Sequence, residues 1–346
     1  MEKAFVTDLR AFLDAIAAEM ELYVPKKSGD YYVFNRYDRA KPAEFNTFRV
    51  CTPVKEFLFP MREMAATYPE VSEPGQIAPF AVFGLKDCDL RSIEVLDKVF
   101  TEAEFEDPFY KGRREKMFII ASDCSEPGES CFCTVFGGGP CAEGGFDLNV
   151  SPVSGGFIIE AGSDKGREFL EKNDRLFTEA DPEMLSQRDR NRQQTLQQLE
   201  QKVAQTVPLD VPVKEVVENT QDSDVFDSVA QSCIECQACT RVCPTCHCFY
   251  LYDTNHEEYF SKMKMWDSCM RTAYSAVAGG ANPRKVLGDR MKHRLLHKFV
   301  YFADRYGMDM CVGCGRCVDA DAGGMDLRDI LSRLAGQYKD KRETKV

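Results

Sequence analysis

Four cysteines in the second half of the chain follow the spacing Cys-x2-Cys-x2-Cys-x3-Cys-Pro, at Cys233, Cys236, Cys239 and Cys243, with Pro244 directly after them. Three thiolates two residues apart can surround one face of a cubane iron–sulfur cluster. The fourth, turned away by the proline, ordinarily binds a second cluster. The motif therefore requires a partner motif elsewhere in the chain.

A second cysteine run near the end of the chain supplies this partner. Cys311, Cys314 and Cys317 repeat the Cys-x2-Cys-x2-Cys spacing. Two such runs are typical of a ferredoxin module that holds two 4Fe–4S clusters and transfers electrons between them. We predict that all seven cysteines of the two runs are cluster ligands.

Zinc binding and disulfide pairing are the alternatives for these cysteines. Structural zinc sites usually present two Cys-x2-Cys knuckles separated by a loop, whereas the first run is tighter and ends in Cys-Pro. Disulfides form in oxidising compartments, and no charged-then-apolar leader precedes Ala4, Phe5 and Val6. The spacing favours iron–sulfur chemistry in a cytoplasmic, strongly reducing setting.

Composition narrows the class of protein. The chain has 346 residues, 44% hydrophobic and 29% charged, which is ordinary for a globular protein of two domains. No apolar stretch approaches the ~20 residues that cross a bilayer, so we expect no membrane span. The formal net charge of −12 argues against nucleic-acid binding, because that requires a concentrated basic surface.

The first part of the chain, residues 1–185, is predicted to be an α/β domain. A strand over 80–83, an amphipathic helix over 90–100 and a strand over 117–121 predict a parallel crossover. An aromatic run over 31–34 predicts one further short strand.

The second part has a different composition. Residues 186–226 are rich in Gln, Asp and Arg, and they predict a linker with a surface helix that ends at two prolines. Beyond the linker strand signals nearly vanish, and the segment between the two cysteine runs looks helical. We predict an α-helical ferredoxin domain with two 4Fe–4S clusters over 227–336 and a charged tail over 337–346.

Nine of the sixteen cysteines lie outside the two runs, which is many for ordinary core residues. Cys88 and Cys124 follow the two strands of the predicted crossover, and the carboxyl ends of parallel strands share one edge of a sheet. Cys131 and Cys133 lie in the next loop. We expect these four thiols to converge and to be able to bind a metal cluster.

Cys246, Cys248 and Cys269 form a second group, which is one thiol short of a cluster. Its fourth ligand would come from elsewhere, for example from the N-terminal group. The alternative for both groups is a set of buried free thiols, which behave as small apolar residues. We predict at least one additional iron–sulfur cluster, and we expect Cys51 and Cys141 to take no part in it.

His293 and His297 are four residues apart, so they share a helix face and could bind a metal. The basic residues around them, which include Arg290, Arg294 and Lys298, favour a different role. A basic helix beside anionic clusters offsets their charge and donates hydrogen bonds to them. A purely structural helix is the alternative.

Sites for other chemistry are missing from the sequence. The glycines of 137–139 are followed by Pro140 where a dinucleotide-binding helix would begin, so this segment is predicted to be a loop. We find no phosphate-binding loop and no nucleophile–base set, and we predict no catalytic residues.

The chain resembles one protein family, the iron–sulfur β subunit of soluble NiFe hydrogenases (sulfhydrogenases), together with the related iron–sulfur subunit of anaerobic sulfite reductase. The matching segments are 84–90, 122–133, 233–248, 266–269, 290–298 and 311–317. The resemblance implies a dicluster subunit that relays electrons. Its partners would be a flavoprotein carrying the NAD(P) site and a catalytic subunit of hydrogenase, sulfite reductase or heterodisulfide-reductase type.

The chain departs from the family pattern at one position. The pattern implies cysteine and proline at 321 and 322, where this chain has Asp321 and Ala322. In the crossed ligation of two-cluster ferredoxins, the missing thiolate belongs to the cluster of the first run. Asp321 is therefore a candidate oxygen ligand. The alternatives are a labile iron or another cysteine such as Cys246.

Two other functions stay open. A cluster with an open iron site in the N-terminal domain would bind substrate directly and make the chain a reductase subunit. Zinc at the cysteine sites would make the chain a structural scaffold.

Overall fold

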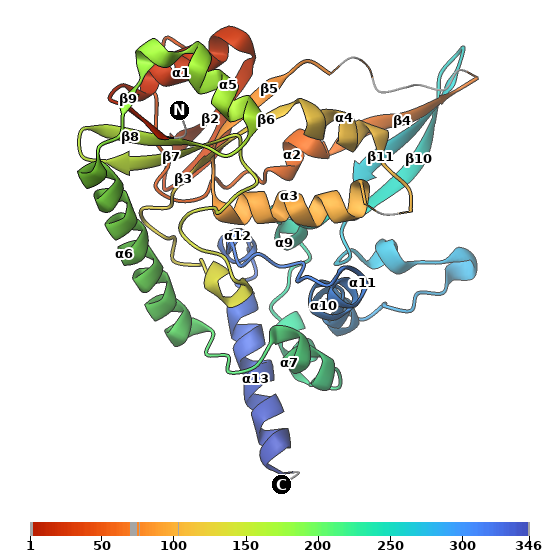
Figure 1. Cartoon of the computed structure of the whole chain (residues 1–346). Coiled ribbons are helices and arrows are strands. Elements are labelled where there is room, and N and C mark those ends of the chain that lie inside the picture. Colours follow the sequence, from red (N-terminus) through yellow and green to blue (C-terminus); the bar gives the residue numbers. More distant parts are fainter. Residues whose placement is uncertain (1–2, 70–74, 76, 103, 345–346) are drawn as a thin grey trace. The chain divides into compact units, whose positions relative to one another are not determined.

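The structure, a computed structural model, describes residues 3–69, 75, 77–102 and 104–344. It divides into two compact units (Figure 1). Unit 1 comprises Met1–Leu58, Pro74–Glu129 and Gly137–Glu200. Unit 2 comprises Phe59–Glu73, Ser130–Phe136 and Gln201–Val346. Two short segments of the first half of the chain therefore belong to the unit that contains both cysteine runs.

Unit 1 is built on an eight-stranded mixed sheet with the order β3-β2-β5-β6-β7-β8-β1-β9. The strands are β1 Lys3–Val6, β2 Glu21–Ser28, β3 Tyr31–Arg36, β5 Phe80–Leu85, β6 Met117–Ser122, β7 Leu148–Val153, β8 Gly156–Ala161 and β9 Thr178–Glu179. Strands β2, β5, β6 and β7 are parallel, and the remaining pairs are antiparallel. Every residue of β6 is buried, as expected for a parallel strand covered on both faces.

Helices cover both faces of this sheet (Figure 1). They are α1 Leu9–Glu19, α2 Lys55–Leu58, α3 Asp87–Phe100, α4 Pro108–Lys116, α5 Asp164–Lys172 and α6 Pro182–Thr206, with a short 3-10 turn η2 Asp174–Leu176. Phe12 and Ile16 of α1 and Phe169 of α5 pack into the core on one face, against side chains of β5, β6 and β7. Helix α3 contacts β5 and β6. The side chain of Asp107 accepts hydrogen bonds from two backbone N–H groups at the start of α4, which fixes where that helix begins.

The parallel crossover predicted from the sequence is confirmed. Strand β5 pairs in parallel with β6, with Phe80 opposite Met117, and α3 and α4 connect the two strands. Lys86 directly follows β5 and Asp123 directly follows β6, so both lie at the same edge of the sheet. The strand predicted over 31–34 is part of β3.

Unit 2 is mostly helical around a separate core. Its helices are α7 Val213–Asn219, α8 Val225–Ala230, α9 Ala238–Arg241, α10 Leu287–Leu296, α11 Phe302–Tyr306, α12 Arg316–Asp319 and α13 Leu327–Glu343. Its short turns are η1 Cys133–Phe136, η3 Thr272–Ser275, η4 Ala278–Gly280 and η5 His297–Tyr301, the last of which joins α10 to α11. Val216, Phe226, Leu295 and Leu331 belong to the core that α7, α8, α10 and α13 share. Within the described residues, no helix is both long and apolar enough to cross a membrane.

The segment between the two cysteine runs differs from the prediction, because it contains a hairpin. Strands β10 Phe249–Asn255 and β11 Phe260–Trp266 pair antiparallel, and β11 also pairs with β4 Arg62–Tyr68. Exposed and half-buried residues alternate along β10, which is the period of a strand. Lys264 and Glu63 form a buried ion pair of 2.5 Å between β11 and β4. The prediction that this whole segment is helical is wrong.

Candidate metal centres

Cysteines from both runs line one small cavity in unit 2. Cys311, Cys314 and Cys317 come from the second run, and Cys243 is the last cysteine of the first run. The ring of Phe132 and the side chain of Lys298 complete the lining. The fourth cysteine of one run thus joins the three cysteines of the other, which is the crossed arrangement of two-cluster ferredoxins.

Glycines between the cysteines of the second run allow a close backbone approach. Gly313 and Gly315 both have positive φ, +63° and +73°. A Cβ at Gly313 would lie 2.4 Å from the carbonyl oxygen of Phe132, and the Phe132 N–H donates to the Gly313 carbonyl at 2.8 Å. Only glycine tolerates both the conformation and the approach. The loop that carries Cys131 and Cys133 is therefore packed against the second run, with Cys131 Sγ 3.9 Å from the Cys314 carbonyl oxygen.

The first run has Asp321 beside it. Burial raises the pKa of Cys233 and of Cys239, and the charge of Asp321 raises both pKa values further, so the carboxylate lies near both thiols. Its Oδ1 atom accepts hydrogen bonds from the N–H of Gly323 at 2.9 Å and the N–H of Met325 at 3.2 Å. Two backbone hydrogen bonds thus hold the carboxylate near the thiols of the first run, and its role as a ligand stays a prediction.

Cys246 and Cys269 both raise the pKa of the buried Arg294, and Cys248 lies beside Cys269. A hydrogen bond with Cys248 and burial together raise the pKa of Cys269 well above its ordinary value. The charge of Cys239 also raises the pKa of Cys269, so the Cys248–Cys269 pair lies beside the first run. Cys246 is buried, and its charge raises the pKa of Arg294 in α10 and of Lys298 in η5.

Two buried basic side chains lie among the thiols. Lys298 Nζ is 3.4 Å from Cys243 Sγ and 3.1 Å from Thr245 Oγ1. Burial alone would lower the pKa of Arg294, but the negative charge that the surrounding cysteines carry when ionised, Cys239 and Cys317 foremost, raises it. The Nε and Nη2 atoms of Arg294 are buried and have no hydrogen-bond partner among the described residues. Buried donors of this kind need acceptors, and the sulfurs of an anionic cluster would supply them.

The residues around the cysteines therefore also suit anionic clusters. The basic segment predicted to lie beside the clusters places Arg294 and Lys298 among the cysteines. Arg290 instead pairs with Glu235 of the first run at 3.1 Å.

His293 and His297 do share a face, and their rings stack with centroids 6.1 Å apart. The ring of His247 lies 5.7 Å from that of His297. Burial, together with the neighbouring His247 and Lys298, lowers the pKa of His297 to about 4, so this ring is neutral at pH 7. No three His, Cys, Asp or Glu side chains in the described ranges meet closely enough to hold a single metal ion. These rings pack α10 and η5 against the segment around His247.

Cys88 and Cys124 lie around one buried lysine in unit 1. Lys86 is fully buried, and its Nζ donates to Ser122 Oγ and the Asp123 carbonyl oxygen, both at 2.8 Å. Burial lowers the pKa of Lys86, and the thiols of Cys124 and Cys88 act in the opposite direction. Cys131 and Cys133 belong to unit 2. The convergence of all four thiols on one cluster stays a prediction.

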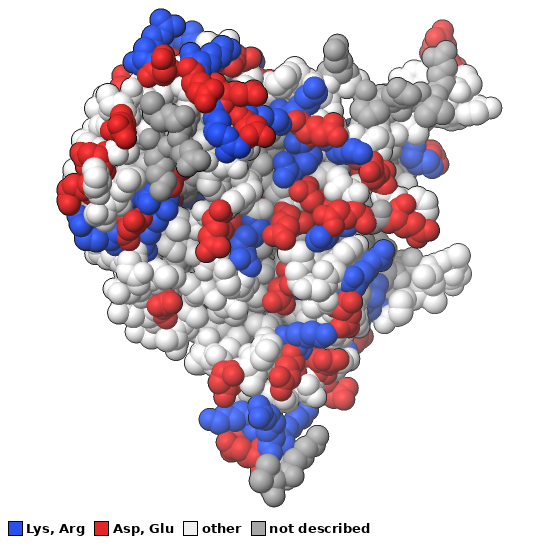
Figure 2. All heavy atoms as spheres, in the orientation of Figure 1, with Lys and Arg blue, Asp and Glu red and all other residues white. Residues whose placement is uncertain are grey.

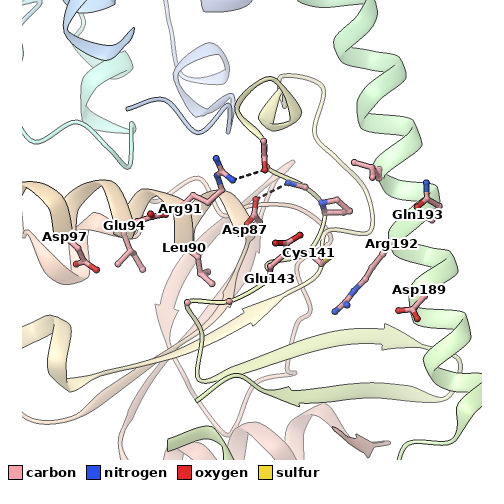
Figure 3. Close-up of a pocket in the computed structure, with 18 of the residues that line it drawn as sticks. Asp87, Leu90, Arg91, Glu94, Asp97, Cys141, Glu143, Asp189, Arg192 and Gln193 are labelled. Carbon is pink, nitrogen blue, oxygen red and sulfur yellow. Dashed lines mark hydrogen bonds between the residues drawn. The ribbon is translucent and has the colours of Figure 1, made fainter. Parts of the chain in front are cut away.

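Unit 1 also contains a pocket of about 750 Å³ that the sequence did not predict (Figure 3). It lies between α3, the loop over 137–145 and α6. Asp87 accepts a hydrogen bond from the Gly139 N–H at 3.0 Å, and Arg91 Nη1 donates to the Gly137 carbonyl at 2.8 Å, so the glycine segment is fastened to α3. Burial raises the pKa of Asp87 to about 6. Cys141 also lines this pocket.

Comparison with known proteins agrees with this arrangement. Residues 232–325 match the family model of a 4Fe–4S dicluster domain, which includes both cysteine runs and Asp321. The chain therefore contains such a domain. It is also 31% identical to the sulfhydrogenase 2 subunit beta of Pyrococcus furiosus over 312 residues, 88% of this chain and 90% of that protein. The chain belongs to the family of sulfhydrogenase beta subunits, and the family predicted from its motifs is confirmed.

Proposed function

We propose that the chain is the iron–sulfur electron-transfer subunit of a cytoplasmic, multi-subunit oxidoreductase of the hydrogenase class. The observation that carries this proposal is the cavity in which Cys243 of the first run joins Cys311, Cys314 and Cys317. A relative named as one subunit of a sulfhydrogenase supports membership in a complex.

The ligand sets follow the crossed arrangement. Cys243, Cys311, Cys314 and Cys317 hold one 4Fe–4S cluster. Cys233, Cys236 and Cys239 hold the other, with Asp321 as the fourth ligand. A carboxylate is a harder ligand than a thiolate and suits cubane iron less well, so the second cluster has one iron that is bound less firmly.

The protein residues prepare these sites for a charged group. Burial raises the pKa of Cys311 and of Cys317 to about 12, so both thiols are protonated at pH 7 until iron displaces the protons. Lys298 and Arg294 then offset the negative charge of the thiolates. When bound, the clusters supply one-electron transfer.

The remaining cysteines are proposed as ligands of one or more additional iron–sulfur clusters. Cys88 and Cys124 lie around the buried Lys86 ammonium, much as Cys243 lies beside Lys298. Nζ of Lys86 donates to the Asn46 carbonyl, Ser122 Oγ and the Asp123 carbonyl, and the thiols of Cys88 and Cys124 beside it are the candidate ligands. Three further cysteines are candidates for a second such site, namely Cys246, Cys248 and Cys269.

The proposed partners are a flavoprotein with the NAD(P) site and a catalytic subunit of hydrogenase, sulfite reductase or heterodisulfide-reductase type. A cluster accepts one electron at a time, whereas a hydride delivers two, so a flavin must divide the pair. The sequence carries no dinucleotide-binding fingerprint, and the flavin is therefore assigned to a partner chain.

Anaerobic mixing with NADH or NADPH tests this relay. The purified chain should keep its cluster absorbance with nicotinamide alone and bleach rapidly once the co-purifying flavoprotein is added. Rapid bleaching by nicotinamide without any flavin would show that the chain has its own hydride site.

A second candidate function is substrate binding in unit 1, favoured by the 750 Å³ pocket lined by Asp87 and Cys141. Pockets of this size hold small molecules. In that case candidate substrates such as sulfite should change the EPR spectrum of the isolated chain, which the relay function does not require.

A further inference from the structure

Arg294 is a cation in the interior of unit 2. On the face that Figure 2 shows, Lys and Arg side chains are mixed with Asp and Glu at the surface, where water hydrates them. Arg294, in contrast, is only 4% exposed. Its Nε and Nη2 atoms are buried and have no hydrogen-bond partner among the described residues. Because a buried charge is costly unless it is paired, this side chain requires anionic acceptors close to it.

The two cysteine runs have the same local conformation. In both runs the residues on either side of the second cysteine have positive φ, +56° and +64° in the first run and +63° and +73° in the second. These residues are Glu235, Gln237, Gly313 and Gly315. Each run then enters a four-residue helix, α9 or α12, whose second residue is the third cysteine of the run. Cys239 of the first run is therefore structurally equivalent to Cys317 of the second.

Arg294 lies near this equivalent cysteine of both runs. Helices α9 and α12 contact each other, so Cys239 and Cys317 come from adjacent helices. Leu295, the next residue of α10 after Arg294, belongs to the core that contains Cys239, and Cys317 packs against the same core. When ionised, Cys239 and Cys317 are also the two groups that raise the pKa of Arg294 most. One buried guanidinium thus has a ligand cysteine of each proposed cluster as its neighbour.

Lys298, the other buried cation among the cysteines, has a different position. Its Nζ is 3.4 Å from Cys243 Sγ, and the charges that raise its pKa most are those of Cys243, Cys246 and Cys311. Cys243 and Cys311 both belong to the ligand set of the second-run cluster, so Lys298 lies beside that cluster alone. An ammonium is a compact point charge, whereas a planar guanidinium directs its N–H donors to several sides. An arginine can therefore donate to two acceptors that lie on different edges of its plane.

We propose that Arg294 lies between the two 4Fe–4S clusters and donates hydrogen bonds to sulfurs of both, so that one buried cation raises both reduction potentials. The inference rests on the proposed function and assigns this residue a role within the relay. Positive charge and hydrogen bonds at a cluster stabilise the electron that reduction adds. A cation between two anionic clusters also reduces their mutual repulsion, so both can hold an electron at the same time. This property suits a relay supplied by a hydride, which delivers two electrons.

Arg294→Met in the full-length, anaerobically purified chain tests the proposal, because it removes the charge and leaves an apolar side chain in the interior. An EPR-monitored redox titration should show that the reduction equilibrium of each of the two clusters shifts toward the oxidised form by about tenfold or more, which is about 59 mV for one electron. Cys236→Ser and Cys314→Ser identify the signal of the first-run and of the second-run cluster. Lys298→Met should shift the second-run cluster alone by this amount.

Arg188→Met is the matched control. Arg188 is also a buried arginine, 7% exposed, but it lies in unit 1 and pairs with Glu160 at 2.7 Å. Its replacement removes a buried cation far along the chain from both cysteine runs, so it should shift the potential of neither cluster. The control therefore separates a general loss of packing from loss of a charge beside the clusters.

A second measurement keeps the native arginine and does not depend on the folding of Arg294→Met. Protein made with ¹⁵N-labelled arginine is reduced, and pulsed EPR records magnetic coupling between the labelled nitrogens and each cluster. Both clusters should show a coupling that disappears in Arg294→Lys, which keeps the positive charge but has no labelled nitrogen at this position. A purely structural arginine would give no such coupling.

Three results would overturn the inference. They are a shift of one potential or of neither in Arg294→Met, an equal shift in Arg188→Met, or a nitrogen coupling to one cluster only. The last result is expected if the donors of Arg294 serve a further cluster at Cys246 and Cys269, whose charges also act on it. Any of these results, obtained with both cluster signals intact, leaves the proposed function in place. Wild-type protein without 4Fe–4S signals would contradict the function itself.

Discussion

Replacing Lys298 by Met should lower the reduction potential of the cluster proposed at Cys243 and the second run. The side chain is 2% exposed, and its Nζ is 3.4 Å from Cys243 Sγ. Burial alone would lower the pKa of Lys298, but the neighbouring thiolates raise it well above its ordinary value, so the ammonium stays charged. Its positive charge stabilises the electron that reduction adds.

The contact distance sets the size of the effect. Two unit charges 3.4 Å apart interact by about 5 kcal/mol at an effective dielectric constant of about 20. For one electron this corresponds to about 200 mV. The added electron is shared by the whole cluster and lies farther from Nζ than the sulfur does. We therefore expect a decrease of about 100 mV, half of this upper bound.

An EPR-monitored redox titration of the anaerobic protein measures this shift. Lys298→Arg keeps the charge and should keep most of the potential, and Lys339→Met removes an exposed charge of α13 and should change nothing. Iron and sulfide content must match the wild type in each variant. A potential for Lys298→Met within about 20 mV of the wild type would refute the electrostatic argument.

The other predictions concern single side chains. Asp321→Cys should alter the potential of the first-run cluster and slow its conversion to a three-iron form; unchanged EPR spectra in both Asp321→Cys and Asp321→Ala would exclude a ligand role. Cys314→Ser should abolish the EPR signal of one cluster while Cys51→Ser keeps both, and two intact clusters in Cys314→Ser would contradict its assignment. Burial raises the pKa of Asp87 to about 6, so the folded state holds this proton more tightly than the unfolded chain. Ionisation of Asp87 therefore destabilises the folded state. This loss of stability is absent below about pH 4, grows as the pH rises, and reaches its full value of at most about 3 kcal/mol above about pH 6. Asp87→Asn should slow hydrogen exchange in α3 at pH 8 but not at pH 4, and equal effects at both values would contradict the shift.

Part of the fold followed from local patterns. The crossover of β5, α3 and β6 has a run of apolar residues at each strand and helical spacing between them, and these signals lie within about 40 residues of sequence. The basic character of residues 290–298 predicted cations beside the clusters, and Lys298 contacts Cys243. Both predictions rest on residues that are close together in the sequence.

Long-range pairing was beyond the sequence. Strand β11 has β10 on one side and β4, from the first half of the chain, on the other. The apolar run 249–252 of β10 shows no alternation in the sequence, and nothing local identifies β4 as a partner in the same sheet. The packing of Phe132 against Gly313 likewise joins distant segments, and it moves Cys131 and Cys133 into unit 2.

Anaerobic determination of iron, acid-labile sulfide and zinc in the full-length chain, with EPR of the reduced protein, tests the central claim most directly. We expect about eight iron and eight sulfide per chain from the dicluster domain alone, more if the remaining cysteines bind a further cluster, and spectra of interacting reduced 4Fe–4S clusters. Zinc bound in place of iron, with no sulfide and no EPR signal, would contradict it.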